Sequence, residues 1–204
     1  ATGEGSRLGG HLARSPARQF TTLDCHDGIP VRPDLDGILD PTAMAALSEL
    51  VLGRGGNASR VLAATPNEID VHQLNATYYA ALGRDDDRYL AARAIQLFAR
   101  GVPQIYYVGL LAGDNDVDAV VRTGEGRAIN RHDYRIDEIT SALERPVIRR
   151  LVDLIRLRAT HPAFEGRLSV EAEGPELRLD WRNGEATCRL EVDVASARLR
   201  ILGV

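Results

Sequence analysis

The fold class is decided by the segment DDDRYLAARAIQLFAR, residues 85–100, which leads directly into GVPQIYYVG, residues 101–109. The first part predicts a helix, because three aspartates stand where the helix dipole favours anions and apolar residues follow at helical spacing. Gly101 and Pro103 end that helix. The second part is a nearly continuous β-prone run, typical of a strand buried on both faces of a parallel sheet. A helix that leads into such a strand predicts an α/β fold.

Upstream of this pair, the sequence predicts a short strand and two helices. Residues 20–25 form a β-prone run that breaks at Gly28. Residues 41–52 predict a helix whose first turn is capped by Asp40, and residues 8–14 have weaker helical character.

Downstream, the apolar periodicity changes from helical to alternating. Residues 146–158 predict an amphipathic helix. Apolar and polar side chains alternate over residues 177–182 and again over residues 188–192, and residues 198–202 predict a further strand. Asn183 and Gly184 predict a type I′ turn within the alternating part. We therefore expect an antiparallel β unit appended to an α/β body.

Composition excludes several classes of protein. The chain has 204 residues, 44% of them hydrophobic, a net charge of −4 and a pI of about 5.8. The hydrophobic content is enough for a core. The negative net charge gives no indication of a basic surface that would bind nucleic acid or an anionic membrane. The longest apolar run, residues 105–112, is too short to span a bilayer. Two isolated cysteines, Cys25 and Cys188, suit a reducing, cytoplasmic location and offer no zinc-type spacing.

Three polar clusters are candidates for chemistry. Residues 24–28 place His26 and Asp27 after a predicted strand, where α/β proteins build active sites, although Asp-Gly is also a common turn. Residues 70–79 are polar and aromatic in a segment expected to be irregular, which suits either a polyol site or a solvated loop. Residues 124–132 carry two arginines that could clamp a carboxylate or phosphate, or lie on the surface.

Four stretches, in order, resemble the sucrose phosphorylases of the α-amylase superfamily. They are QFTTLDCHDGI (residues 19–29), NATYYAALG (75–83), GVPQIYYVGLLAG (101–113) and GRAINRH (126–132). The resemblance runs from about residue 14 to about residue 165 and continues more faintly beyond it. It implies the carboxyl-terminal part of a (β/α)8 TIM barrel, with strands 7 and 8 and their helices in residues 1–162 and an inserted loop subdomain in residues 29–77. Residues 163–204 would form a small carboxyl-terminal antiparallel β domain.

The resemblance also implies an activity, namely retaining transfer of a glucosyl group from sucrose to inorganic phosphate. By similarity, Asp27 would stabilise the cationic transition state, His26 would bond to the same sugar, and Arg127 would orient its far hydroxyls. On the acceptor side, a mobile loop would contribute Asp70, His72 and Gln73. No metal or organic cofactor is implied.

His72 departs from the family pattern, in which tyrosine is common at this position. A histidine there resembles the variants that act on sucrose 6′-phosphate, where the imidazole could pair with the sugar phosphate. Phosphorylases of glucosylglycerol or glucosylglycerate, an α-glucoside hydrolase or transglucosidase, and a non-catalytic carbohydrate-binding module remain alternatives.

The nucleophile and the acid/base glutamate of the family lie upstream of the seventh strand, so neither is expected in this chain. This predicts a carboxyl-terminal fragment that is inactive alone, and a first residue other than Met is compatible with a trimmed protein as well as with a piece of a longer one. Such a fragment would leave its buried strand and both amphipathic helices without partners. We therefore expect the isolated chain to aggregate or to form a homodimer.

Overall fold

A computed structural model describes residues 3–30, 40–62 and 69–203, without the side chains of residues 30 and 59–72. The chain forms two compact units. The first comprises Ala1–Thr22, Asp86–Gln104 and Pro146–Val204, and the second comprises Leu23–Asp85 and Ile105–Arg145.

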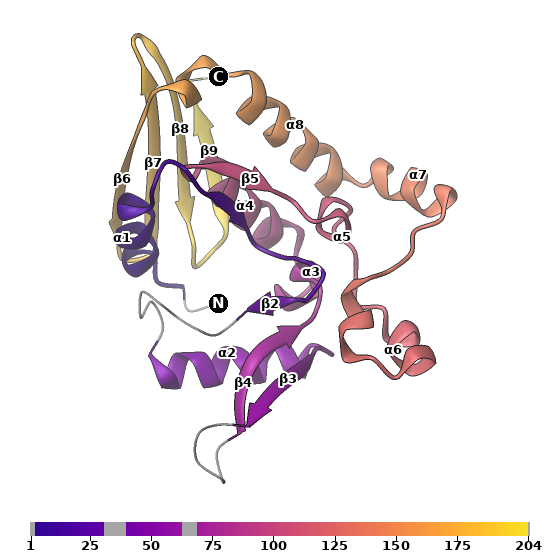
Figure 1. Ribbon diagram of the computed structural model, residues 1–204. Coiled ribbons are helices and arrows are strands. Elements are labelled where there is room, and N and C mark those ends of the chain that lie inside the picture. The colour runs from indigo at the N-terminus through magenta and orange to yellow at the C-terminus, as the bar shows by residue number, and fades with distance from the viewer. Residues whose placement is uncertain (1–2, 31–39, 63–68, 204) are drawn as a thin grey trace. The chain divides into compact units, whose positions relative to one another are not determined.

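The first unit contains a four-stranded antiparallel sheet with the strand order β6-β7-β8-β9. Its strands stand side by side, with α1 next to β6 (Figure 1). Alternating apolar residues give it one buried face, on which Leu177, Leu179 and Leu190 are almost fully enclosed. The bounds are α1 Ser6–Arg14, β6 Arg167–Glu173, β7 Glu176–Asn183, β8 Ala186–Asp193 and β9 Arg198–Leu202.

The turn between β7 and β8 differs from the type I′ turn predicted at Asn183 and Gly184. Asn183 pairs with Ala186, so the two central residues are Gly184 and Glu185. Only Gly184 has a positive φ, of 58°. That arrangement matches a type II′ turn, because type I′ requires a positive φ at both central residues.

Two helices of this unit pack against each other, α4 Asp86–Phe98 and α8 Pro146–Thr160. They contact one another, and α4 also contacts β8 and β9. The indole Nε1 of Trp181 donates to the Phe98 carbonyl at 2.7 Å, tying β7 to the end of α4. The expectation that both helices would lack partners is therefore wrong, because α4 packs against the antiparallel sheet and α8 packs against α4.

The parallel pairing expected of an α/β fold is present between β1 Phe20–Thr22 and β5 Val102–Gln104. The buried Gln96 amide donates to the carbonyls of Thr21 and Gln104, each at 2.8 Å, and so joins α4 to both strands.

The strand expected over residues 102–109 is much shorter in the structure. It ends at Gln104, and α5 Tyr107–Leu110 follows as a short helix. β1 ends at Thr22, so the later residues have no ladder partner there and their β propensity is overridden. Burial of this strand on both faces is also contradicted, since Val102 is 59% exposed.

The second unit contains a three-stranded antiparallel sheet, order β2-β4-β3, with α2 packed against β3 and β4 (Figure 1). A small core of Val51, Leu74, Ala76 and Ala81 joins them. The carboxylate of Asp40 accepts from the Ala43 amide at 2.8 Å, which confirms the predicted cap. The bounds are β2 Ile29–Pro30, α2 Pro41–Gly53, β3 Asn57–Leu62, β4 Ile69–Asn75 and α3 Tyr78–Ala81.

The remaining elements of this unit follow α5, and one of them contains Arg127 and is directly followed by Arg131. They are α6 Val117–Thr123, the 3-10 helix η1 Gly126–Asn130 and α7 Ile136–Glu144. The two compact units divide the chain differently from the expected ranges 1–162, 29–77 and 163–204, which stay predictions. In the part of the chain that the structure describes, no helix has the length and apolarity to cross a membrane.

Candidate functional site

A tight turn at residues 25–28 displays His26 and Asp27. The Gly28 amide donates to the Cys25 carbonyl at 3.1 Å and closes the turn. Gly28 has a φ of +100°, and a Cβ there would fall on the Leu74 carbonyl oxygen. Glycine is therefore required at this position by both its conformation and the nearby β4 backbone.

Two arginines from the η1 region bind the Asp27 carboxylate. Arg127 Nη1 lies 2.8 Å and Arg131 Nη2 3.2 Å from the same oxygen, Oδ1. Arg131 also donates through Nε to the His26 carbonyl at 2.8 Å, and Asn130 Nδ2 donates to the Cys25 carbonyl at 2.8 Å. Four bonds thus hold the residue 25–27 turn to residues 127–131.

These contacts keep Asp27 ionised. The hydrogen bond from Arg127 lowers the pKa of the Asp27 carboxyl below its usual value, and the charges of His26, Arg127 and Arg131 act in the same direction. The side chain remains 32% exposed, so a ligand can still reach a permanent negative charge.

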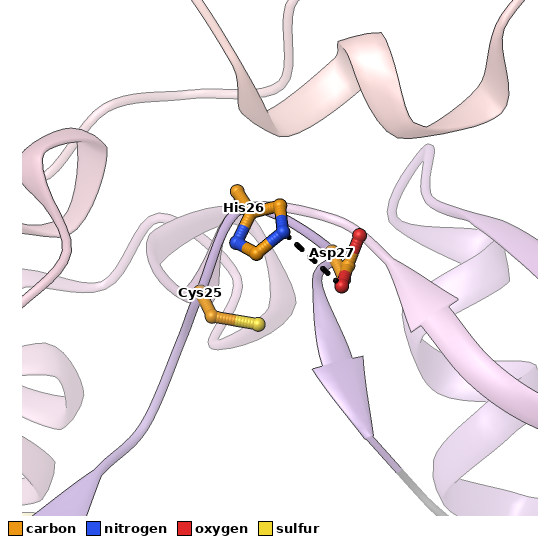
Figure 2. Close-up of side chains that lie close together, drawn as sticks. All are labelled: Cys25, His26 and Asp27. Atoms are coloured by element: carbon orange, nitrogen blue, oxygen red, sulfur yellow. Dashed lines mark ion pairs between the residues drawn. The ribbon is translucent and has the colours of Figure 1, made fainter.

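His26 approaches the other carboxylate oxygen of Asp27. Figure 2 shows the imidazole beside the carboxylate, with Nε2 3.3 Å from Oδ2. The His26 ring is 66% exposed, so its ring edge is open to solvent. The pair presents a hydrogen-bonding group and an anion together, a combination suited to polyhydroxylated ligands.

Cys25, His26 and Asp27 each offer a metal-ligating atom, and these atoms lie within 4.8 Å of one another (Figure 2). Two observations argue against a metal ion there. Asp27 already carries two guanidinium groups, which repel an incoming cation, and Cys25 Sγ lies 3.6 Å from the Gly28 carbonyl as a donor. The donor set therefore does not fit a metal centre.

A polar hollow of about 470 Å³ adjoins this cluster, a size within the range of small-ligand sites. Asn57 helps to shape it, donating to the Gly126 carbonyl at 3.0 Å and accepting from Asn75 at 2.7 Å. The hollow is lined by Asn57, Ala58, Asn75, Glu125, Gly126, Arg127 and Arg131.

No family model matches the chain. Comparison with curated proteins finds 47% identity over 195 residues to the sucrose 6(F)-phosphate phosphorylase of Thermoanaerobacterium thermosaccharolyticum, covering 94% of this chain and 40% of that protein. A sucrose phosphorylase of Agrobacterium vitis is 44% identical, over 98% of this chain and 43% of its own length. The chain is a homologue of the sucrose phosphorylases. It spans about two fifths of the length of these relatives.

A solved structure agrees with the sequence comparison. The crystal structure of the sucrose 6F-phosphate phosphorylase from Thermoanaerobacter thermosaccharolyticum matches this homologue with a TM-score of 0.93 and 45% identity. The match covers 98% of this chain and 41% of the solved chain. The mixed α/β elements and the final four-stranded antiparallel sheet are thus shared with part of that structure.

Three of the sequence-predicted site residues come together in this sucrose phosphorylase homologue, namely His26, Asp27 and Arg127. The other three, Asp70, His72 and Gln73, lie in β4 rather than in irregular chain, so that expectation is wrong. The strand forms because β3 supplies a ladder partner and Leu74 is buried. The side chains of Asp70 and His72 lie outside the described residues.

Sequence reasoning did not single out Arg131 or Asn130 as site residues in this homologue. Both belong to residues 124–132, where two arginines suggested a clamp for a carboxylate or a phosphate. In the structure, Arg127 and Arg131 bind the carboxylate of Asp27 in the same chain. The two arginines in residues 124–132 were the sequence feature that indicated a binding role. Their positions in the sequence did not reveal that Asp27 is their partner.

Proposed function

We propose that this chain is part of a retaining disaccharide phosphorylase, which transfers a glucosyl group from sucrose or sucrose 6′-phosphate to inorganic phosphate and yields α-glucose 1-phosphate. The observation that carries the proposal is the ionised Asp27, held by two arginines at the edge of a polar hollow. The similarity to phosphorylases named for sucrose and its phosphate supports the substrate class.

In this proposal, Asp27 stabilises the positive charge that develops on the sugar as the glycosidic bond breaks. Its fixed position, held by the ion pairs with Arg127 and Arg131, allows that stabilisation without reorientation during the reaction. His26 donates to a hydroxyl of the same sugar, and Arg127 orients the far hydroxyls through its remaining N–H groups.

The chain would form the end of a (β/α)8 barrel, in which β1 and β5 are the seventh and eighth strands. Their parallel pairing supports this assignment, and their exposed face, carrying Phe20 and Val102, would point toward the other strands. The covalent nucleophile and the acid/base glutamate would come from the rest of the enzyme, so the 204-residue chain alone should be inactive.

Phosphate dependence tests the proposal directly. The full-length protein is incubated with sucrose or sucrose 6′-phosphate, with and without inorganic phosphate, and α-glucose 1-phosphate and free glucose are measured. A phosphorylase forms α-glucose 1-phosphate only when phosphate is present. Release of glucose at the same rate without phosphate would instead identify a hydrolase.

The acceptor side is proposed to include Asp70, His72 and Gln73 in β4. His72 is proposed to favour sucrose 6′-phosphate, because a partly cationic imidazole can pair with the sugar phosphate. Replacing His72 with tyrosine should lower kcat/KM for sucrose 6′-phosphate relative to sucrose. An unchanged ratio of the two values would remove the phosphate-pairing role.

A further inference from the structure

His132 directly follows Arg131 and lies between two carboxylates. Its Nδ1 is 2.5 Å from Asp116 Oδ2, and its Nε2 is 3.2 Å from Glu138 Oε1. Ionised carboxylates only accept hydrogen bonds, so both contacts are satisfied together only when the ring carries a proton on each nitrogen. The geometry therefore fits an imidazolium, with the ring 30% exposed.

Both carboxylates are themselves fixed at the start of a helix. Asp116 caps α6, because its Oδ1 accepts from the Ala119 amide at 2.8 Å. Glu138 lies in the first turn of α7, and its Oε2 accepts from the Arg135 amide at 2.7 Å. The His132 ring thus links two helix starts that enclose, in sequence, the segment that carries Arg127 and Arg131.

We propose that His132 is a positioning residue, whose protonated ring, shared between Asp116 and Glu138, holds the residue 126–131 segment against Asp27. Its neighbour Arg131 bonds both the Asp27 carboxylate and the His26 carbonyl, so displacement of His132 would be transmitted directly to the site. The effect on catalysis rests on the proposed function, whereas the structural effect does not.

Other groups also surround the ring. The Tyr134 ring stands edge-on to it at 4.6 Å, and Tyr107 of α5 donates to the His132 carbonyl at 3.0 Å. The charge of Arg122 in α6 lowers the pKa of Asp116, and the charge of Asp137 in α7 raises the pKa of Glu138. Among the described residues, the charged groups that act on the imidazole are the carboxylates of Asp116 and Glu138, and both favour its protonated form.

This arrangement makes the link sensitive to pH. The hydrogen bond to Asp116, followed by the one to Glu138, raises the pKa of His132 above its ordinary value, although partial burial opposes them. Because the pKa is raised by folding, the link is complete below the unfolded value of about 6.5 and is lost as pH rises through the raised value. The neutral ring keeps one N–H and turns a lone pair toward the other carboxylate.

Amide hydrogen exchange tests the proposal in the full-length protein, without any assay of activity. Protection factors of residues 126–131 are measured from about pH 6 to about pH 9, which brackets the ordinary histidine pKa. We expect protection to fall by about tenfold as His132 loses its proton, the size of one charge-assisted hydrogen bond. In His132→Gln, protection should be low throughout and show no such step.

A matched control is His161→Gln, since His161 bonds the Gly203 carbonyl and pairs with no carboxylate among the described residues. This variant should keep the pH step in residues 126–131. The same step in both His132→Gln and wild type would overturn the proposal.

A second measurement covers the case in which His132→Gln destabilises the whole fold. The ring proton of His132 is titrated by NMR in wild type, Asp116→Asn and Glu138→Gln. The pKa should fall in both variants and further in Asp116→Asn, whereas an ordinary pKa in wild type would overturn the proposal. If the full-length protein lacks phosphorolysis but the pH step is present, the proposed function fails and the positioning role stands.

Discussion

At the scale of single residues, the central feature is one carboxylate paired with two guanidinium groups. Asp27 binds Arg127 and Arg131, which are separated from it by 100 and 104 positions in sequence. The arrangement fixes the carboxylate and keeps it charged, so its role in ligand binding depends on residues that are remote in the chain.

The pKa of Asp27 should depend more on Arg127 than on Arg131. The hydrogen bond from Arg127, at 2.8 Å, is the largest cause of its lowered pKa, whereas the charge of Arg131, whose Nη2 lies at 3.2 Å, lowers it less. Arg127→Gln should therefore raise the pKa more than Arg131→Gln, as measured by NMR titration of the carboxyl carbon. The contribution of the Asp27–Arg127 ion pair to folding stability is present above the unfolded pKa of Asp27, about 3.9. It is lost as the pH falls through the lowered pKa of the folded state.

Removing the charge of Asp27 tests its proposed catalytic role. In the full-length protein, Asp27→Asn should reduce kcat by about 10²- to 10³-fold, because the amide does not stabilise a developing cation as a carboxylate does. The exposed Asp133 offers a control in the same unit, and Asp133→Asn should leave kcat within about twofold. Nearly equal values of kcat for the two variants would contradict the role.

At the scale of elements, the site depends on how the residue 25–28 turn meets β4. Gly28 is forced to be glycine by its positive φ and by the nearby Leu74 carbonyl. Gly124 also has a positive φ, of 72°, but no atom lies within 4 Å of a Cβ placed there.

These two glycines provide a matched pair of substitutions. Gly28→Ala should lower the free energy of unfolding by about 2–3 kcal/mol, since it combines backbone strain with a steric clash. Gly124→Ala should cost about 1 kcal/mol, from strain alone. Urea unfolding followed by circular dichroism measures both, and equal losses would show that the contact with β4 is not restrictive.

At the scale of the whole molecule, the two-stranded β1–β5 sheet leaves apolar side chains uncovered. Phe20 and Val102 are register partners and both are largely exposed. Exposed strands with apolar faces promote association between chains.

Self-association of the 204-residue chain should therefore depend on this face. The wild-type chain should show a mass that rises with concentration in sedimentation experiments, and Phe20→Asp should shift it toward the monomer. Leu143→Asp, at an exposed position in α7, provides the control and should not change the association. Concentration-independent monomer in wild type would contradict the prediction.

The sequence alone determined the elements whose signals are local. Helical periodicity and capping residues predicted α2, α4 and α8 to within a few residues, and the alternating pattern predicted strands β7 to β9 of the antiparallel sheet but not β6. His26, Asp27 and Arg127 were also identified from sequence, through the resemblance of their surrounding stretches. Each of these signals is carried by neighbouring residues, because side-chain spacing and caps act within one or two turns of chain.

Only the tertiary structure decided the features that depend on distant partners. The strand at residues 102–109 stops at Gln104 because its ladder partner stops, and residues 69–75 become a strand because β3 lies beside them. The contact of Asp27 with Arg131 and the placement of His132 between Asp116 and Glu138 likewise arise from folding. Ladder hydrogen bonds and ion pairs form between whichever groups the fold brings together, so their partners follow from the path of the chain.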